Sequence, residues 1–187
     1  MNIFYLDNDT ATCAEMHNDK HCVKMILEYA QLLSTAHRVL DGVIAEGVSA
    51  TGRKRKSYVL SDSRESVLYF ATHINHPSAV WVRKSNENYI WLYDLWHKLM
   101  NEYTYRYGKN HASERLMGYL SALPINIPNG RFTEPTLAMP DEYKVPGDAI
   151  TSYRNYYINS KSHLAKWKNR ATPNWYVHDT LQTGVLA

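Results

Sequence analysis

The chain has 187 residues, 44% of them hydrophobic, which is enough for the core of one ordinary domain and short for two. Its 21 Lys and Arg against 18 Asp and Glu give a formal net charge of +3, so a histone-like polycation is excluded and any basic surface must be local. Two cysteines, Cys13 and Cys22, are too few for a disulfide framework, and free thiols are typical of a reducing compartment. The N-terminus lacks the pattern of a secretory signal, and no apolar run reaches the length of a bilayer span. We therefore expect one cytosolic domain, residues 1–187, without membrane contact.

The first half of the chain is predicted to be mostly helical. Residues 2–6 are β-prone and precede a turn-like Asp-Asn-Asp run, which predicts a short strand or an extended lead-in. Three helices are predicted after it, over residues 11–17, 20–40 and 62–72, the second of them capped by Asn18 or Asp19. Residues 42–58 contain three glycines and four consecutive basic residues, Arg53 to Lys56, without a helical period. This segment predicts a solvated basic loop or a loose hairpin.

The second half contains the strongest helical pattern, which runs between a predicted cap, Ser85, and a predicted stop, Gly108. Shorter helices are predicted over residues 113–122 and 148–167. Between them, residues 124–147 hold five of the seven prolines and no steady period, which predicts a long irregular loop. The sequence thus predicts a mainly α protein, a single-domain irregular bundle of about five to six helices with a short N-terminal strand and a long Pro-rich loop.

The predicted helix over residues 20–40 is apolar around most of its circumference, as a buried helix is. Its remaining polar residues recur at steps of three and four and so share one face; this polar row is His21, Lys24, Glu28, Gln31 and Thr35. A narrow solvent face with an ordinary Lys24–Glu28 ion pair explains such a row. A row that lines a pocket explains it equally, and desolvation there shifts pKa values toward acid and base roles. We predict His21, Lys24 and Glu28 as catalytic candidates and Gln31 as a substrate-binding one.

His17 and His21 have the spacing with which two imidazoles on one helix share a metal ion. Glu28 would lie about 10 Å along the axis from His21, too far to join the same ion. The sequence contains no paired Cys-x-x-Cys, no His-Glu-x-x-His, no phosphate-binding glycine loop and no nucleophile elbow. We therefore predict neither a metal nor another cofactor, and we assign His17 to substrate binding.

A second candidate segment surrounds Pro77, where one helix must end and another begin. Helix N-termini present free backbone N–H groups that favour anions. The segment supplies His76 as a catalytic candidate and four substrate-binding candidates, Asn75, Arg83, Ser85 and Asn88. Capping together with a structural Trp81 is the alternative explanation.

Basic and aromatic residues interleave near the C-terminus. Cations neutralise phosphates while rings stack on bases, so this mixture is typical of binding to single-stranded nucleic acid or to an extruded base. A helix that packs its rings inward and its cations outward has the same composition. The substrate-binding candidates here are Arg154, Lys161, Trp167, Arg170 and Trp175.

Several stretches resemble a family of small helical phage proteins. They are Asn2-Ile-Phe-Tyr-Leu-Asp7, His17-Asn-Asp-Lys-His21 with Lys24-Met-Ile-Leu-Glu28, His76-Pro-Ser-Ala-Val-Trp-Val-Arg83, Glu102-Tyr-Thr-Tyr-Arg-Tyr-Gly-Lys109, and Trp167-Lys-Asn-Arg170 with Pro173-Asn-Trp175. The resemblance covers nearly the whole chain, and the nearest functional group is the amino acid:DNA transferases of thymidine-hypermodifying phages. It implies an enzyme of the host cytoplasm that binds DNA and replaces an activated group on the 5-methylene of a pyrimidine with an amine or amino acid. In such a reaction His21 or Glu28 would deprotonate the amine, and cations such as Lys24 and Arg83 would hold the leaving pyrophosphate.

Two other classes of function fit the same residues. One is a non-catalytic nucleic-acid-binding phage accessory protein that uses the C-terminal segment. The other is a nucleotide hydrolase or glycosylase-like enzyme with the same pocket. The enzyme hypotheses require five side chains to converge on one site: His21, Lys24, Glu28, His76 and Arg83.

Overall fold

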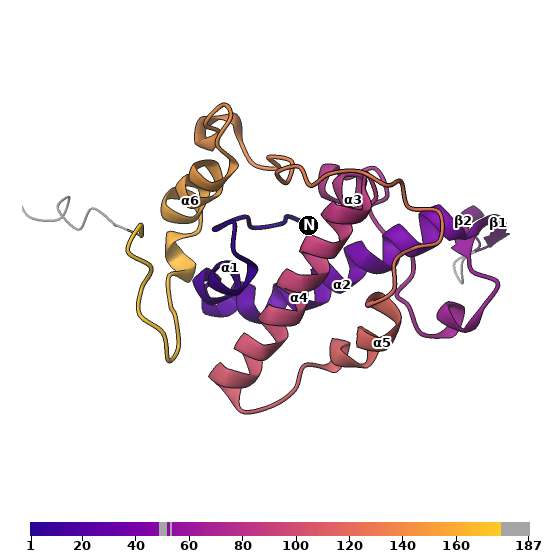
Figure 1. Cartoon of the computed structure of the whole chain (residues 1–187), viewed down its shortest axis with the longest axis horizontal. Helices are drawn as coiled ribbons and strands as arrows, with labels where there is room; N and C mark the ends of the chain where they lie inside the picture. Colours follow the sequence, from indigo (N-terminus) through magenta and orange to yellow (C-terminus); the bar gives the residue numbers. More distant parts are fainter. Residues whose placement is uncertain (49–51, 53, 177–187) are drawn as a thin grey trace, which may run out of the picture.

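The structure, a computed structural model, describes residues 1–48, 52 and 54–176. Within these residues it contains six α-helices and one two-stranded antiparallel sheet, which confirms the predicted mainly α class. The α-helices are α1 (Thr10–Met16), α2 (Asp19–Asp41), α3 (Pro77–Val82), α4 (Asn86–Tyr107), α5 (Met117–Leu120) and α6 (Ala149–Ser160). Figure 1 shows α2 and α4 crossing at the centre, α6 on one flank, and the hairpin of β1 (Val43–Val48) and β2 (Lys54–Val59) projecting at the opposite end. No helix in the described part of the chain is both long and apolar enough to cross a bilayer.

Helix α2 is the central element, and its start follows the predicted capping. The Asn18 side chain accepts the backbone N–H of His21, which satisfies one of the free donors of the first turn. Most apolar side chains of α2 are buried, and α4 packs against the helix, with Trp96 Nε1 donating to the carbonyl of Ile26 at 2.9 Å. Val23 and Leu27 are the exceptions, 40% and 39% exposed, so burial explains most of the apolar pattern but not all of it.

Helix α4 also begins and ends where the sequence predicts. The Ser85 hydroxyl accepts the backbone N–H of Asn88, and Gly108 ends the helix in the left-handed conformation at φ 66°. A residue without Cβ adopts this conformation without strain, so the chain can turn sharply there. Both predicted boundaries are confirmed.

Of the two predictions for residues 2–6, the extended lead-in is confirmed and the strand is wrong. Ile3, Phe4, Tyr5 and Leu6 are 0–4% exposed and run through the middle of the molecule as an extended segment that pairs with no strand among the described residues (Figure 1). Side chains satisfy its backbone instead: the Phe4 N–H donates to the Tyr29 hydroxyl at 3.1 Å, and the Leu6 carbonyl accepts Arg154 Nε at 3.0 Å. These residues have the composition of a strand because buried extended segments and strands favour the same side chains.

The helix predicted over residues 62–72 is also wrong, since only the short 3-10 helix η1 (Ser63–Ser66) forms there. The guanidinium of Arg38, 1% exposed, takes the carbonyl oxygens that a longer helix would use. It donates to the carbonyls of Glu65, Leu68 and Tyr69 at 2.7–3.0 Å. The loop is therefore organised by a side chain of α2 rather than by its own backbone.

The remaining elements are shorter than predicted. Residues 42–58 fall largely within a hairpin, with Val43 paired to Val59 and Val48 to Lys54. The helix predicted at 113–122 is the 3-10 helix η2 (Ala112–Leu116) followed by α5, and the one at 148–167 is α6 followed by η4 (Ser162–Leu164). The loop over residues 124–147 holds only η3 (Asp141–Tyr143) and crosses the molecule from α5 to α6 (Figure 1). Cys13 and Cys22 are buried free thiols, as predicted.

Candidate functional site

The polar row lies on one face of α2, with buried ends and an open middle. His21 is 5% exposed and Thr35 is fully buried. Between them the Lys24 side chain is 66% exposed and the Glu28 side chain 14%, with Gln31 half-buried. Solvent or a ligand can therefore reach the row at Lys24 and Glu28.

His21 closes one end of the row. Its Nδ1 lies 2.6 Å from the Tyr157 hydroxyl, and its ring stacks on Phe4 with centroids 4.1 Å apart. The Asn18 amide oxygen accepts the backbone N–H of His21, so the amide nitrogen of Asn18 faces the His21 ring, 3.4 Å from Nδ1. This nitrogen can only donate. Nδ1 is thus an acceptor, and the ring carries its proton on Nε2.

Burial is the main reason that the pKa of His21 is lowered to about 3. The charges of His17, Lys24 and Lys161 act in the same direction. A ring with this pKa is neutral at pH 7 and donates through Nε2. His21 therefore fits the role of a hydrogen-bond donor better than that of a base.

His17 is fully buried and lies outside the row. It is the C-cap of α1, so His17 and His21 do not share a helix and the metal geometry of an i,i+4 pair is absent. Its Nδ1 donates to the Cys13 carbonyl at 2.7 Å, its Nε2 lies 2.9 Å from the Tyr29 hydroxyl, and burial lowers its pKa to about 4. Among the described residues, no three His, Cys, Asp or Glu side chains are grouped so that they could hold a metal ion.

The open middle of the row is an ion pair. Lys24 Nζ lies 3.0 Å from Glu28 Oε1, and Glu28 Oε2 lies 4.0 Å from the α-amino group of Met1. The Met1 ammonium and the Glu28 carboxylate both affect the pKa of His76. Burial lowers this pKa most, the ammonium lowers it further, and Glu28 opposes the change. Glu28 is thus near enough to affect the pKa of His76, and their sharing of one site stays a prediction.

His76 caps α3. Its Nδ1 accepts the backbone N–H of Ser78 at 3.2 Å, so the neutral ring carries its proton on Nε2. The Nδ1 atoms of His21 and His76 already accept hydrogen bonds, from the Tyr157 hydroxyl and from the Ser78 N–H, whereas the Glu28 oxygens face only the ammonium groups of Lys24 and Met1. Glu28 is therefore the base that the geometry favours.

Arg83 belongs to another part of the molecule. Arg83 is the C-cap of α3. Burial lowers the pKa of its guanidinium, and Tyr58 of β2 opposes that effect. Its Nη1 is buried and has no hydrogen-bond partner among the described residues. No contact among the described residues joins Arg83 to the polar row, so the expected convergence of all five side chains on one site is not observed.

The other candidates around Pro77 have structural contacts. Ser85 and Asn88 form the cap of α4, and Asn88, fully buried, also donates to the Trp81 carbonyl at 3.0 Å and accepts the Thr133 N–H at 2.8 Å. Asn75 is exposed. These contacts correspond to the capping explanation given above.

The C-terminal candidates mostly tie the chain to itself. Arg154 donates to the Leu6 carbonyl and lies over the Trp175 ring, with 5.3 Å from Cζ to the ring centroid. Arg170 pairs with Glu102 at 2.8 Å, and Trp167 donates to the Met16 carbonyl at 2.9 Å. Lys161 lies 4.7 Å from the Tyr156 centroid and differs from the others in acting on the pKa of His21.

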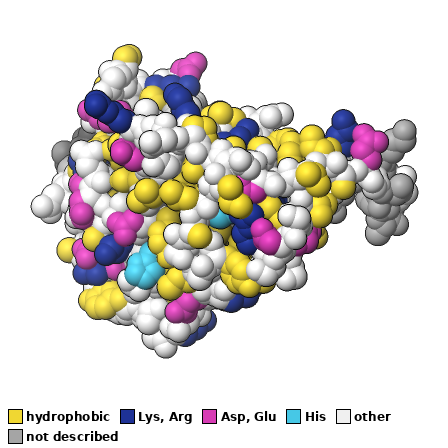
Figure 2. All heavy atoms as spheres, turned by 45° about the vertical axis from the view of Figure 1, so that its right-hand side comes forward, with side chains coloured by type: hydrophobic (Ala, Val, Ile, Leu, Met, Phe, Trp, Pro, Cys, Tyr) yellow, Lys and Arg dark blue, Asp and Glu magenta, His cyan; other side chains and the backbone are white. Residues whose placement is uncertain are grey.

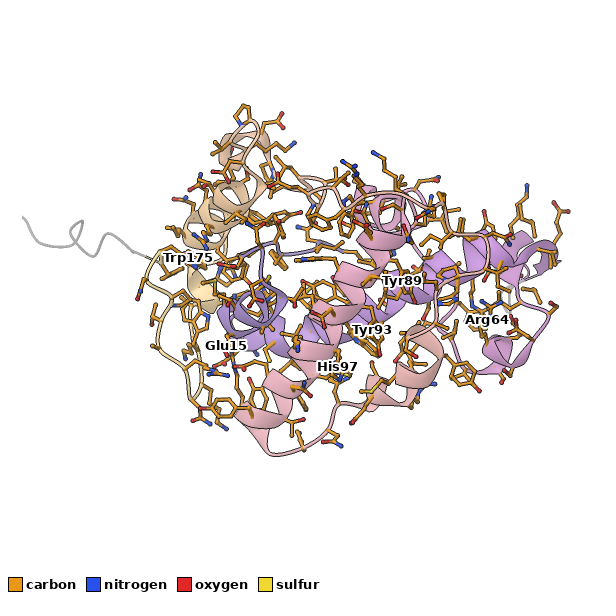
Figure 3. The ribbon with its side chains drawn as sticks, viewed as in Figure 1. Glu15, Arg64, Tyr89, Tyr93, His97 and Trp175 are labelled. Atoms are coloured by element: carbon orange, nitrogen blue, oxygen red, sulfur yellow. The ribbon has the colours of Figure 1, made fainter. Side chains whose placement is uncertain are left out.

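Tyrosine hydroxyls hold the buried histidines, and the sequence patterns did not predict these pairs. Three pairs recur: His17 with Tyr29, His21 with Tyr157 and His37 with Tyr89, at 2.6–2.9 Å. In the third pair, Arg64 Nη1 also lies 3.0 Å from His37 Nδ1. Figure 3 shows Arg64 toward the hairpin end of the molecule and Tyr89 on α4, whereas Trp175 and Glu15 lie at the other end. The excess of tyrosine, 15 against 3 phenylalanines, was the available signal.

Comparison with known protein families, with curated proteins and with solved structures finds no match to this chain. Function is therefore argued from the geometry of the site and from the sequence.

Proposed function

We propose that the protein is a phage DNA-base-modifying enzyme that transfers an amine or amino acid to an activated 5-hydroxymethyl pyrimidine in DNA. The observation that carries the proposal is the Lys24–Glu28 pair, 3.0 Å apart, on the solvent-accessible stretch of the polar row, where Glu28 also affects the pKa of His76. We propose that this base, this cation and the neutral imidazole of His76 act on one substrate.

These groups match what the transfer requires. The amine nitrogen forms a bond to the 5-methylene carbon, and the bond from that carbon to the pyrophosphate oxygen breaks, so that pyrophosphate leaves with the electron pair. Glu28 accepts the proton that the amine releases. Lys24 and the Nε2–H of His76 stabilise the charge that develops on the leaving oxygens.

Local positive charge supports DNA as the partner. The run Arg53 to Lys56 places four basic residues in succession on a chain whose net charge is only +3. Lys161, near His21, adds a cation close to the row. A basic run in the sequence and a cation near the row suit a polyanionic substrate.

The test uses DNA carrying the pyrophosphate ester of 5-hydroxymethyluracil, supplied with a mixture of amino acids and polyamines. Enzymatic digestion and mass spectrometry of the nucleosides would reveal the transferred group. Loss of a general base lowers turnover by about 100-fold or more, so we expect that effect for Glu28→Gln, and a comparable loss for Lys24→Met.

The matched control is Asp141→Asn, which breaks a surface pair between Asp141 and Lys144 at 2.7 Å that lies outside α2. It should leave turnover unchanged. If the Glu28 and Lys24 variants fold and keep wild-type turnover, the Lys24–Glu28 contact is an ordinary surface ion pair without a catalytic role. Salt-dependent DNA binding without turnover would instead indicate an accessory protein, and hydrolysis of free nucleotides or release of bases would indicate the hydrolase or glycosylase alternative; either result overturns the proposal.

A further inference from the structure

The hairpin meets the body of the molecule at a pocket of about 220 Å³. Its walls come from β1, from β2 and from the irregular segment after η1: Ile44, Lys56, Ser57, Tyr58, Phe70, Ala71, His73 and Ile74. Figure 2, with the hairpin end turned forward, shows hydrophobic side chains gathered between the body and the projecting tip, where charged side chains follow. The pocket is thus formed only where these three segments come together.

The walls suit a flat ring. Phe70 is 61% exposed and Ile44 59%, which are large values for apolar side chains, and Tyr58 adds a second aromatic ring. Pockets for drug-sized ligands measure about 300–1,000 Å³, so a cavity of 220 Å³ takes one small ring system. None of the eight lining residues, all in the described part of the chain, is acidic.

Two cationic side chains lie near the same pocket. Lys56 lines it, with Nζ 3.8 Å from Glu46, and Arg83, whose Nη1 has no hydrogen-bond partner among the described residues, is close enough to Tyr58 for Tyr58 to affect its pKa. Rings combined with cations bind single-stranded nucleic acid, because bases stack on the rings while phosphates meet the cations. Charge complementarity therefore favours an oligonucleotide over an acidic protein segment, which offers no ring to the apolar walls.

The pocket is connected to the polar row. Thr72, between Ala71 and His73, donates its N–H to the Thr35 hydroxyl at 3.2 Å, and Thr35 is the last member of the row. Glu28 lies seven residues before Thr35 on α2, about 10 Å along the axis, a distance that two or three nucleotides of one strand span. A strand whose reacting base is at Glu28 would therefore bring a neighbouring nucleotide to the pocket.

We propose that this pocket binds an unstacked base of single-stranded DNA, two or three nucleotides from the base that is modified. The inference rests on the proposed function, because the reacting base defines that spacing. Binding is tolerant of sequence, since every base presents a stacking face. Phe70 is the specificity-determining residue for single-stranded over duplex DNA, because a paired base is not available to enter the pocket.

The test measures the fluorescence anisotropy of labelled 12-nucleotide single strands and of the matching duplex, at 50–200 mM salt. We expect Phe70→Ala to weaken single-strand binding at least about fivefold, and Phe70→Tyr, which keeps the ring, to stay within about twofold of the wild type. Lys56→Ala should reduce the slope of log affinity against log salt by about 0.7, whereas Phe70→Ala should leave that slope unchanged. The control is Ile125→Ala, because Ile125 is 78% exposed and does not line this pocket.

A second measurement needs no substitution. Photocrosslinking of the wild-type protein to a strand that carries one 5-iodouracil should attach the base to Phe70 or Tyr58, and peptide mass spectrometry locates the site. Wild-type binding that Phe70→Ala leaves intact, with crosslinks elsewhere, overturns the pocket and leaves the transferase proposal standing. Ring-dependent binding and crosslinking without any transferred amine would reject the transferase and keep the pocket; absence of DNA binding rejects both.

Discussion

The Tyr157 hydroxyl lies 2.6 Å from Nδ1 of His21, although the two residues are 136 positions apart. Tyr29 and Tyr89 hold His17 and His37 in the same way. Each tyrosine supplies a polar partner without bringing a charge into the core, so the histidine stays neutral and its ring packs like an aromatic residue. The three pairs have a common consequence for the pH dependence of stability.

The free energy of unfolding should fall steeply as the pH drops from 6.5 toward 4. The folded pKa values of His17 and His37 are about 4, and that of His21 about 3, mainly because of burial, whereas the unfolded value is 6.5. Below pH 6.5 the unfolded chain therefore binds more protons than the folded one, and each histidine contributes about 1 kcal/mol per pH unit to the loss. Above pH 6.5 these groups contribute no slope.

Urea denaturation between pH 7.5 and 4.5 measures this dependence. His37→Gln should remove about a third of the histidine contribution to the slope. His163→Asn, at an exposed position, should preserve it. A slope that His37→Gln leaves unaltered would mean that His37 is not neutral in the fold.

Glu102→Gln should lower the free energy of unfolding by about 2 to 3 kcal/mol, because it leaves a buried cation without its closest carboxylate. The Arg106 side chain is fully buried, 2.6 Å from Glu102. Asp19, 3.0 Å from Arg106, remains in the variant and limits the loss of unfolding free energy. In a chain of this size the melting temperature should fall by about 5 to 10 °C. Calorimetry measures the shift.

The surface pair of Lys144 and Asp141 provides the comparison, because Asp141 is 96% exposed. Asp141→Asn should change the melting temperature by no more than about 2 °C. Equal shifts for the two variants would show that burial does not distinguish these ion pairs.

Gly42→Ala should destabilise the junction of α2 with the hairpin. An added Cβ would lie 2.5 Å from the Arg38 carbonyl oxygen and 3.1 Å from that of Val59, both backbone atoms that cannot yield cheaply. We expect a loss of about 1 to 3 kcal/mol in unfolding free energy. Gly47→Ala is the control within the same hairpin, because no atom lies within 4 Å of its added Cβ. If the two variants are equally stable, the chain can relax at Gly42 at no cost.

The elements that the sequence predicts well are those governed by local rules. Residues 20–40 and the segment between Ser85 and Gly108 carry their apolar period and caps within themselves, and both form helices. Residues 62–72 also have helical composition, yet Arg38, 27 positions before Glu65, takes their carbonyl groups. Tertiary contacts of this kind override a weak local preference.

The same distinction applies to the candidate site. The spacing on α2 suffices to align Lys24 with Glu28, because helical geometry is a local property. The effects of Glu28 on His76 and of Tyr58 on Arg83 depend on how α3 packs against α2 and α4, and spacing within one segment does not encode that. Pairs such as His21 with Tyr157 depend on the closure of the whole chain.

The buried N-terminal segment has a consequence for synthesis of the protein. Ile3 to Leu6 are buried in the core, yet Arg154, which donates to the Leu6 carbonyl, is synthesised 148 positions after it. At about 5–20 residues per second, the segment waits roughly 7 to 30 seconds for its partner. During that time its apolar side chains are open to other chains, so slow translation of the final third should favour aggregation, and a chaperone that shields emerging segments should raise the yield of folded protein.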